Sequence, residues 1–396
     1  MSRVAIVVVR FGAGITGGAE AHARQVAQRL AARHDVTVLT TCAEDYVTWA
    51  DALPEGESRD GPLRVLRFPV RHPRDLAAWE ATMQPILRGT WSDDDEQALL
   101  LEQGPDVPLL LDHLRTHGED YDAVIFFTLL YAPAVLGIPL VWDRALLVPT
   151  LHDEAAAHLL AQARAIRLAR WVMWNTPEER ELAERLYDVA GLPGAICGVG
   201  VEPPDDLQPR RARERFGLER PYLLYAGRID PDKGCGELID HFSAWAQSDQ
   251  RADLVLAGRA WMDLPQHSRI RPVGMVERDA LWDLVAGAVA TVVPSRRESL
   301  SMIALESLAC GVPVLVPSGS PVLEGHARRS AGGLVYRNSA EFAAAATLLL
   351  DRPETAAALG RDGRRYVAAN FTWARVEALY ERAIAAILQH RRQPAA

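Results

Sequence analysis

The sequence predicts an α/β protein with two Rossmann-like domains that face each other across a cleft. Strand-length apolar runs alternate with helical runs in both halves of the chain, which is the rhythm of a parallel sheet. The alternation stops near the middle, where prolines cluster. The length of 396 residues also suits two domains of ordinary size better than a single core.

The first domain is expected over residues 1–200. The apolar run 4–9 is typical of a parallel strand buried on both faces, and apolar residues then recur at helical spacing over 19–30. Residues 71–118 are rich in Trp, Pro and Asp, interrupt the rhythm, and are expected to be mostly helical decoration. The predicted strands are 4–9, 36–41, 65–70, 121–128, 145–151 and 171–175.

A linker is predicted at 201–210, because Pro203, Pro204 and Pro209 can continue neither a helix nor a central strand. The second domain is expected over 211–371. Residues 339–390 are rich in alanine and are predicted to be helical. The predicted strands of this domain are 222–226, 254–257, 290–294 and 314–317.

Composition excludes some classes of protein. The formal net charge of -9 argues against a nucleic-acid partner, since such proteins usually carry a basic face. No apolar run approaches the ~20 residues that span a bilayer, and the N-terminal run is too short for a signal peptide. We therefore expect a cytoplasmic protein with reduced, structural cysteines; these are Cys42, Cys197, Cys235 and Cys310.

The strongest functional motif occupies residues 294–313, where an apolar strand turns into a helix. Glu298 comes just before the predicted helix and Glu306 lies within it. The first N–H groups of the helix, over residues 300–303, have no partner of their own and attract phosphate. Two carboxylates beside them suit a ligand with an anion in the middle and hydroxyls at both ends. The alternative is that Glu298 caps the helix and Glu306 merely lies on its face.

This block, with Pro-Ser before it and Ala-Cys-Gly-Val-Pro after it, resembles the E-x7-E region of the retaining glycosyltransferases of family 4 (glycosyl transferases group 1). The resemblance implies the GT-B architecture and a last helix, 372–396, that crosses back to the first domain. It implies that Glu298 contacts the donor hexose and that Glu306 binds the ribose hydroxyls. Leu300, Ser301 and Met302 are then donor-binding positions. Ser301 departs from the family pattern, which usually has Gly there, and is expected to restrict the donor sugar.

The second motif is Gly227-Arg228 followed by Lys233-Gly234, between a strand end and the next helix. A nucleotide diphosphate needs a cationic clamp, because the charge on the leaving group grows during transfer. The family has the same Gly-Arg and Lys-Gly arrangement, which implies that Arg228 and Lys233 hold the diphosphate. The alternative is two solvated loop cations.

The loop after the first strand can be interpreted in two ways. Gly12, Gly14 and Gly17 match the dinucleotide fingerprint, which also expects an acidic residue at the end of the second strand. That strand ends in Thr40-Thr41 instead. Gly17-Gly18-x-Glu20 resembles the entry loop of the transferase family, which implies that Gly17 and Gly18 approach the donor phosphates.

Two smaller features carry further expectations. His152 follows a strand end, and in the family a histidine near this position points at the donor sugar. Asp153 and Glu154 are expected to be favourable charges at the start of the next helix. The turn around Gly274 resembles the base-binding turn of the family, where the backbone at Met275 reads the base.

The acidic run 93–96 contains Asp-x-Asp, which holds a metal ion in another glycosyltransferase fold. Here it precedes a helical run, so it is expected to be a helix cap and an acidic first turn. No metal ion and no other cofactor are therefore expected.

The sequence thus predicts a retaining, metal-independent transfer of a hexose from a nucleotide-diphosphate sugar to an acceptor hydroxyl. His152, Glu298, Arg228 and Lys233 are the predicted catalytic residues. The acceptor class stays open between a glycan, a lipid-linked molecule and a small molecule, and a lipid-linked acceptor would bring the protein to the inner face of the membrane. The competing class is a non-catalytic subunit that binds nucleotide sugars for another transferase.

Overall fold

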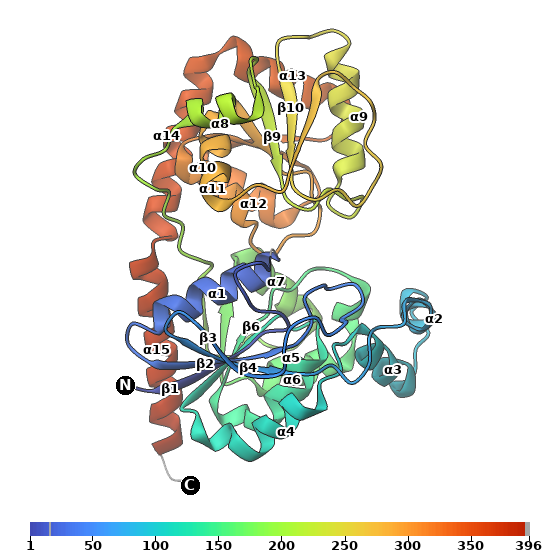
Figure 1. Cartoon of the computed structure of the whole chain (residues 1–396), viewed down its shortest axis with the longest axis vertical. Coiled ribbons are helices and arrows are strands. Elements are labelled where there is room, and N and C mark those ends of the chain that lie inside the picture. Colours follow the sequence, from blue (N-terminus) through green and yellow to red (C-terminus); the bar gives the residue numbers. More distant parts are fainter. Residues whose placement is uncertain (16, 393–396) are drawn as a thin grey trace. The chain divides into compact units, whose positions relative to one another are not determined.

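The computed structural model describes residues 1–15 and 17–392, with the side chain of residue 392 left out. The chain divides into two compact units. Unit 1 holds Met1–Val199 and the C-terminal residues from Val376 on, and unit 2 holds Gly200–Arg375. Each unit contains one mostly parallel sheet with helices around it (Figure 1). The expected α/β fold class with two Rossmann-like domains is therefore confirmed.

Unit 1 is built on an eight-stranded sheet with the order β3-β4-β2-β1-β5-β6-β7-β8. All neighbouring strands are parallel except β3, which pairs with β4 in the antiparallel sense. Both faces are buried, because Ala5 and Val7 of β1 belong to one apolar cluster while Val4 and Ile6, which point the other way, are also fully buried. The strands are β1 (Arg3–Val7), β2 (Asp35–Thr41), β3 (Gly56–Asp60), β4 (Leu63–Phe68), β5 (Ala123–Phe127), β6 (Ala145–Val148), β7 (Trp171–Trp174) and β8 (Gly194–Ile196).

The helices of unit 1 follow the expected βαβ order. Helix α15 begins in unit 2 and lies against unit 1 through ion pairs such as Arg29–Glu377 and His34–Glu381. The elements are α1 (Gly18–Leu30), α2 (Leu76–Leu87), α3 (Asp93–Gln103), α4 (Pro108–His117), η1 (Gly118–Asp120), α5 (Ala132–Gly137), η2 (Ile138–Arg144), η3 (Ala155–His158), α6 (Leu160–Leu168), α7 (Pro177–Leu186) and α15 (Trp373–Arg392).

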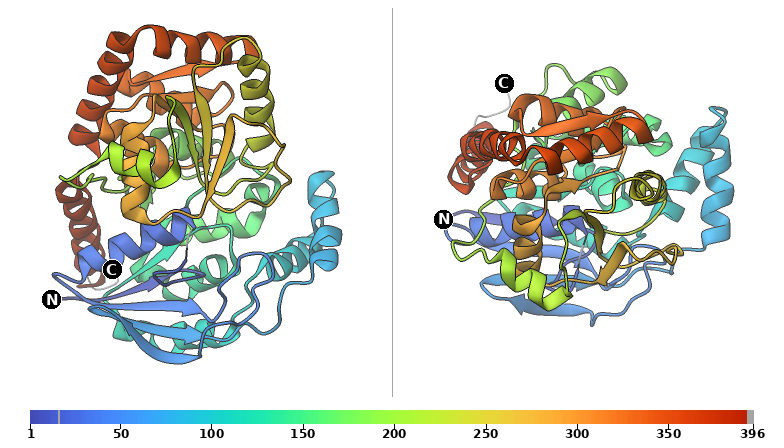
Figure 2. Two further views of the ribbon diagram at one scale, coloured as in Figure 1. Left: turned by 45° about the horizontal axis from the view of Figure 1, so that its top comes forward. Right: turned by 90° about the horizontal axis from the view of Figure 1, so that it is seen from above.

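Treating the whole of residues 71–118 as decoration was wrong at its C-terminal end. Only α2 and α3 project from the unit (Figure 2). Helix α4 is the crossover between β4 and β5, and its Leu110 and Leu114 are fully buried in the main apolar cluster. The Trp- and Pro-rich residues before α4 separate it from β4. The sequence therefore does not indicate this crossover, because a βαβ unit is recognised only when strand and helix follow each other closely.

Unit 2 is a six-stranded, wholly parallel sheet with the order β11-β10-β9-β12-β13-β14. Its strands are β9 (Tyr222–Ala226), β10 (Asp253–Ala257), β11 (Ile270–Gly274), β12 (Ala290–Val292), β13 (Val314–Pro317) and β14 (Gly333–Tyr336). Its helices are α8 (Pro209–Phe216), α9 (Cys235–Ala246), α10 (Arg278–Gly287), α11 (Met302–Cys310), α12 (Pro321–Ser330), α13 (Ser339–Asp351) and α14 (Pro353–Asn370).

The predicted strands of both units are present, with shifts of a few residues at their ends. The run 4–9 forms a strand only to Val7, and 290–294 only to Val292, because the chain turns into the loops that follow. The list of predicted strands lacks β3, β8, β11 and β14. These four strands lie at the edges of their sheets, where a strand pairs on one side only and needs no long apolar run.

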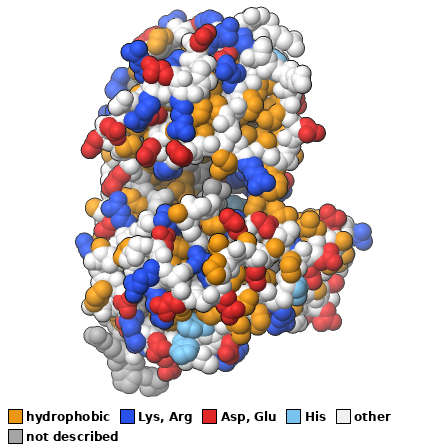
Figure 3. All heavy atoms as spheres, in the orientation of Figure 1, with side chains coloured by type: hydrophobic (Ala, Val, Ile, Leu, Met, Phe, Trp, Pro, Cys, Tyr) orange, Lys and Arg blue, Asp and Glu red, His pale blue; other side chains and the backbone are white. Residues whose placement is uncertain are grey.

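All four cysteines are buried and free, as expected. Acidic and basic side chains are interspersed over the face drawn in Figure 3. None of the helices in the described part of the chain combines the length and the apolar character needed to cross a membrane.

Candidate functional site

The candidate site of unit 2 lies where the strand order reverses. From β9 the chain moves to β10 and β11 on one side and then returns to β12 on the other side of β9. The carboxyl ends of β9 and β12 therefore lie side by side at a switch point, which is where ligands bind in open α/β sheets. The Arg228–Lys233 loop follows β9, and the loop with Glu298 follows β12.

The two loops contact each other directly. The Lys233 Nζ atom lies 2.8 Å from Glu298 Oε1, and both side chains are mostly shielded from solvent. Gly234 has a φ of +75°, and a Cβ atom there would lie 2.5 Å from the Pro294 carbonyl oxygen. Only glycine permits this approach. A direct ion pair thus joins the loops of the two motifs, and their role as one ligand site stays a prediction.

Lys233 is the only lysine among the 43 Lys and Arg residues of the chain. An ammonium group is a compact charge with three rotatable donors, whereas a guanidinium is a planar fork. A chain that uses arginine at every other basic position has kept lysine at this one, which indicates that the shape of the cation matters there.

Arg228 forms an ion pair with Asp230, a residue that sequence reasoning missed. Asp230 also accepts a hydrogen bond from the Lys233 backbone N–H at 2.8 Å. One carboxylate thus orders the loop and neutralises Arg228, as Glu298 neutralises Lys233. Asp230 lies two residues after Arg228, and such short-range acceptors are the only signal that could have revealed it.

Glu306 lies on α11, with only 3% of the residue exposed. The Arg278 Nη2 atom at the start of α10 lies 2.5 Å from Glu306 Oε1, but this close ion pair lacks the alignment of a hydrogen bond. The Arg278 guanidinium also stacks 4.7 Å from the centre of the Trp282 ring. Glu306 is therefore a buried acceptor whose Oε1 atom could still receive hydrogen bonds from hydroxyl groups, and Arg278 is a second residue that the sequence did not reveal.

Ser301 is the residue just before α11, and its backbone is left-handed with φ of +64°. Its Oγ atom is buried and makes no hydrogen bond with the described residues. Glycine favours this conformation, whereas an L-residue is strained in it. Ser301, rather than Glu298, is the N-cap residue of α11, and its side chain caps none of the helix N–H groups.

The turn after β11 carries Gly274, with φ of +73°, and Met275, whose side chain is mostly exposed. Gly258, after β10, donates from its N–H to the Gly274 carbonyl at 2.8 Å. A Cβ atom on Gly258 would lie 1.8 Å from the Gly227 carbonyl oxygen. Close backbone packing therefore brings the turns after β9, β10 and β11 together, with Gly227 and Met275 at this edge of the sheet.

In unit 1, Gly17 precedes α1 and leaves room for a buried ion pair. A Cβ atom on Gly17 would lie 1.9 Å from Glu20 Oε2, and Arg10 Nη2 lies 2.5 Å from Glu20 Oε1. Gly18 has open space around it. Strand β2 ends in Thr41, whose hydroxyl donates to the Val9 carbonyl, so no carboxylate stands where a dinucleotide fingerprint needs one.

His152 follows β6, with 30% of its side chain exposed, and its Nδ1 lies 3.8 Å from Glu154 Oε1. Glu154 precedes η3 without capping it, and Asp153 pairs with His158. Treating Asp153 and Glu154 as first-turn helix charges was therefore wrong, because both carboxylates face histidines. The backbone next to His152 is held by Glu179, which accepts from the Leu151 N–H at 2.7 Å.

The acidic run 93–96 caps helices, as expected. Ser92 and Asp95 form a reciprocal capping box at the start of α3. Glu96 reaches further and accepts from the backbone N–H groups of Leu160 and Ala161 at the start of α6. The run thus fastens the projecting α2–α3 pair to the segment that follows His152.

These geometries agree with the comparisons to known proteins. Residues 208–366 match the family glycosyl transferases group 1. This segment contains Arg228, Lys233, Met275, Glu298 and Glu306, whereas Gly17, Gly18 and His152 lie outside it. The chain is thus similar to this family over residues 208–366.

Curated relatives and solved structures are also similar to this chain. The chain is 30% identical over 261 residues to D-inositol 3-phosphate glycosyltransferase 2 of Catenulispora acidiphila, covering 58% of this chain and 60% of that protein. The chain thus spans about 60% of the length of the curated relative. Sucrose-phosphate synthase of Thermosynechococcus elongatus has a TM-score of 0.68 at 19% identity, over 98% of this chain and 100% of that one.

A further solved structure is HepE of Anabaena in complex with UDP and glucose. Its TM-score is 0.68 at 16% identity, over 97% of this chain and all of that one. At such low identity, these two structural likenesses establish the fold. The fold is the GT-B type shared by glycosyltransferases, with two Rossmann-like domains.

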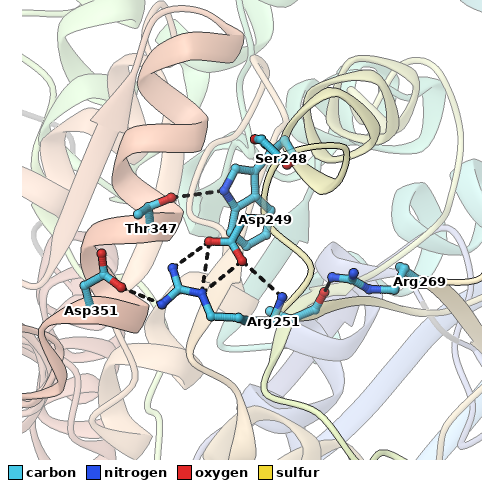
Figure 4. Close-up of polar contacts among 8 residues, drawn as sticks. Ser248, Asp249, Arg251, Arg269, Thr347 and Asp351 are labelled. Carbon is cyan, nitrogen blue, oxygen red and sulfur yellow. Dashed lines mark hydrogen bonds and ion pairs between the residues drawn. The ribbon is translucent and has the colours of Figure 1, made fainter.

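Unit 2 also has a shallow surface hollow between α9 and α13, but the charged side chains around it pair with one another (Figure 4). Arg251 bridges Asp249 at 2.6 Å and Asp351 at 2.5 Å, and Trp245 Nε1 donates to Thr347 Oγ1 at 3.0 Å. The hydrogen bond from Arg251 holds the pKa of Asp249 below its usual value. These contacts hold α9 and α13 together and leave no unpaired charge among the residues described above for a ligand. The candidate site is therefore the sheet edge with Lys233 and Glu298.

Ser301→Gly is expected to stabilise the protein. Glycine removes the left-handed strain of about 1–2 kcal/mol, and the greater freedom of the unfolded glycine chain offsets about 0.4–1 kcal/mol of that gain. Thermal unfolding should show a higher midpoint for Ser301→Gly than for wild type. Ser301→Ala is the matched control, because it removes the hydroxyl and keeps the strained Cβ. A glycine variant no more stable than the alanine variant would contradict the strain.

Proposed function

We propose that this chain is a retaining glycosyltransferase that moves a hexose from a nucleotide-diphosphate sugar to an acceptor hydroxyl without a metal ion. The observation that carries the proposal is the Lys233–Glu298 contact of 2.8 Å between the loops after β9 and β12. It brings a cation for the diphosphate and a carboxylate for the sugar hydroxyls together at the switch point of the sheet.

The roles of the remaining residues follow from chemistry and position. A donor would release Lys233 and Arg228 from their carboxylate partners, so that both cations turn to the diphosphate. The first N–H groups of α11 would add to their field. Glu306 would accept from the ribose hydroxyls and Glu298 from the hexose. No protein carboxylate need act as a nucleophile, because the leaving phosphate can take the proton of the acceptor.

The first test is a thermal-shift screen of nucleotide sugars with UDP, GDP and ADP as sugar-free probes. A ligand stabilises the folded state by RT ln(1 + [L]/Kd), so the correct donor should raise the unfolding midpoint by an amount that grows with the logarithm of its concentration above Kd. We also expect slow hydrolysis of that donor, measured as release of the nucleotide diphosphate. This hydrolysis should persist in excess EDTA. A released sugar that has the same anomeric configuration as the donor would complete the assignment.

The second candidate is a non-catalytic subunit that binds nucleotide sugars for another transferase. It is favoured by the neutralised state of the cations, since Arg228 and Lys233 each already face a carboxylate. Tight donor binding without any turnover, with and without candidate acceptors, would favour this subunit over the enzyme. Activity that vanishes with EDTA and returns with Mn²⁺ or Mg²⁺ would contradict the metal-independent chemistry.

A further inference from the structure

Behind the start of α11, a buried histidine of α12 forms hydrogen bonds to the loop that carries Glu298. The His326 Nε2 atom lies 2.9 Å from the Leu300 carbonyl oxygen, and the residue is completely buried. Its Nδ1 atom lies 3.0 Å from the Tyr366 hydroxyl of α14. A carbonyl oxygen can only accept, so Nε2 carries the proton and Nδ1 accepts from Tyr366.

The Leu300 carbonyl shares a peptide group with the N–H of Ser301. In a planar trans peptide the C=O and the N–H point in opposite directions. A bond that fixes the Leu300 carbonyl toward His326 therefore fixes the Ser301 N–H away from it, at the residue that directly precedes α11. The first N–H groups of α11 have no partner within the helix and are the ones suited to phosphate.

Close helix packing supports the chain of hydrogen bonds from Tyr366 through His326 to Leu300, which we call the histidine relay. Helix α14 packs closely on α11, because a Cβ atom on Gly363 would lie 2.6 Å from the Leu308 side chain. Tyr366 follows Gly363 by three residues on the same helix, and its ring meets His326 edge-on with ring centres 6.0 Å apart. The left-handed backbone of Ser301 would otherwise be free to relax, since its hydroxyl makes no hydrogen bond with the described residues.

We propose that His326 is a positioning residue for the diphosphate of the donor, acting through the Leu300–Ser301 peptide. Tyr366 holds the ring through Nδ1, His326 holds the Leu300 carbonyl, and the Ser301 N–H is thereby aimed at a phosphate oxygen. A hydrogen bond to the carbonyl also polarises the peptide, which makes its N–H a better donor. The inference rests on the proposed function, because it needs a nucleotide diphosphate at this helix start.

The test compares a nucleotide diphosphate with its own nucleoside. The tightest binder among UDP, GDP and ADP is titrated calorimetrically, and the matching nucleoside is measured by competition against it. His326→Leu should weaken the diphosphate about tenfold, the loss expected for roughly one hydrogen bond. Nucleoside affinity should change by less than about twofold, because the ribose and base contacts do not run through Leu300.

Three further variants separate positioning from a general loss of structure. His326→Gln places an amide N–H near the position of Nε2 and should recover most of the diphosphate affinity. Tyr366→Phe keeps the imidazole but removes the hydroxyl that bonds to its Nδ1 atom. This variant should weaken diphosphate binding by a smaller factor. His241→Leu, which removes another largely buried histidine of unit 2, should leave the ratio of the two affinities unchanged.

Each outcome decides one question. Equal weakening of nucleoside and diphosphate by His326→Leu, or full diphosphate affinity in that variant, would overturn the positioning role and leave the proposed function standing. A wild-type protein that binds none of the three diphosphates would contradict the proposed function itself, and the relay with it.

Discussion

Lys233→Ala is expected to lower kcat/KM of the correct nucleotide sugar by about 10²–10³, or roughly 2–4 kcal/mol, which is the range for loss of one preorganised donor at a developing oxyanion. The ammonium group lies at the end of the loop after β9, beside Glu298 and next to the start of α11. Negative charge grows on the leaving diphosphate only as the glycosidic bond breaks, so the loss should appear mainly in kcat. Steady-state kinetics of donor hydrolysis measure it.

Two variants serve as controls for this loss. Lys233→Arg keeps the charge but changes its shape, and should recover only part of the activity because a planar fork cannot replace a compact ammonium group. Arg210→Ala removes the cation of another 2.8 Å pair of unit 2, Arg210–Glu214 on α8, and should leave kinetics unchanged. Wild-type turnover in Lys233→Ala would show that the charge on the leaving group is stabilised elsewhere.

The stability of unit 1 is expected to fall between about pH 4.5 and pH 8 because of Glu179, and Glu179→Gln should abolish that fall. Burial raises the pKa of Glu179 to about 8, against the opposing effect of N–H donors from Leu151 and Asn175. The folded state therefore favours the protonated acid. Below the unfolded pKa of 4.5 this contribution is fully present, and it is lost as the pH rises through 8.

The size of the effect follows from the pKa difference of 8 minus 4.5, which at 1.36 kcal/mol per unit gives at most about 5 kcal/mol. Thermal or denaturant unfolding of the wild-type protein and of Glu179→Gln from pH 5 to pH 9 measures this effect as the difference between their free energies of unfolding. His22 acts in the opposite direction, since burial lowers its pKa to about 4 and its contribution is lost as the pH falls below 6.5. His22 is common to both proteins and cancels. If the difference in the free energy of unfolding between wild type and Glu179→Gln does not change from pH 5 to pH 9, the N–H donors keep Glu179 ionised.

The sequence was most informative where backbone geometry restricts residue choice. Gly234 has to be glycine because its loop contacts Pro294, and Gly17 because it leaves room for Glu20. Such positions are visible in a sequence as motifs, so the edge with Lys233, Glu298 and Glu306 could be predicted before the structure. Buried parallel strands were equally visible, since both of their faces must be apolar.

The partners of the site residues could not be predicted. Asp230, Arg278 and His326 lie in segments whose composition is ordinary for loops and helix starts, and their importance depends on contacts that only the folded chain makes. Helix α4 was hidden because the α2–α3 pair separates it from β4 by many residues. The histidine relay joins residues 300, 326 and 366 from three separate elements, and no local pattern connects them.

A practical consequence follows from the single lysine. Apart from the N-terminus, the ammonium group of Lys233 is the only primary amine of the chain, and about a third of its side chain is exposed. Reagents that couple proteins to sensor surfaces, dyes or cross-linkers through amines would therefore attach either at the N-terminus or at the candidate donor site. Protein attached through Lys233 should fail to bind nucleotides whatever its true affinity, whereas attachment through an affinity tag leaves the site open. The same selectivity turns the lysine into a reporter, since a bound diphosphate should protect it from acylation.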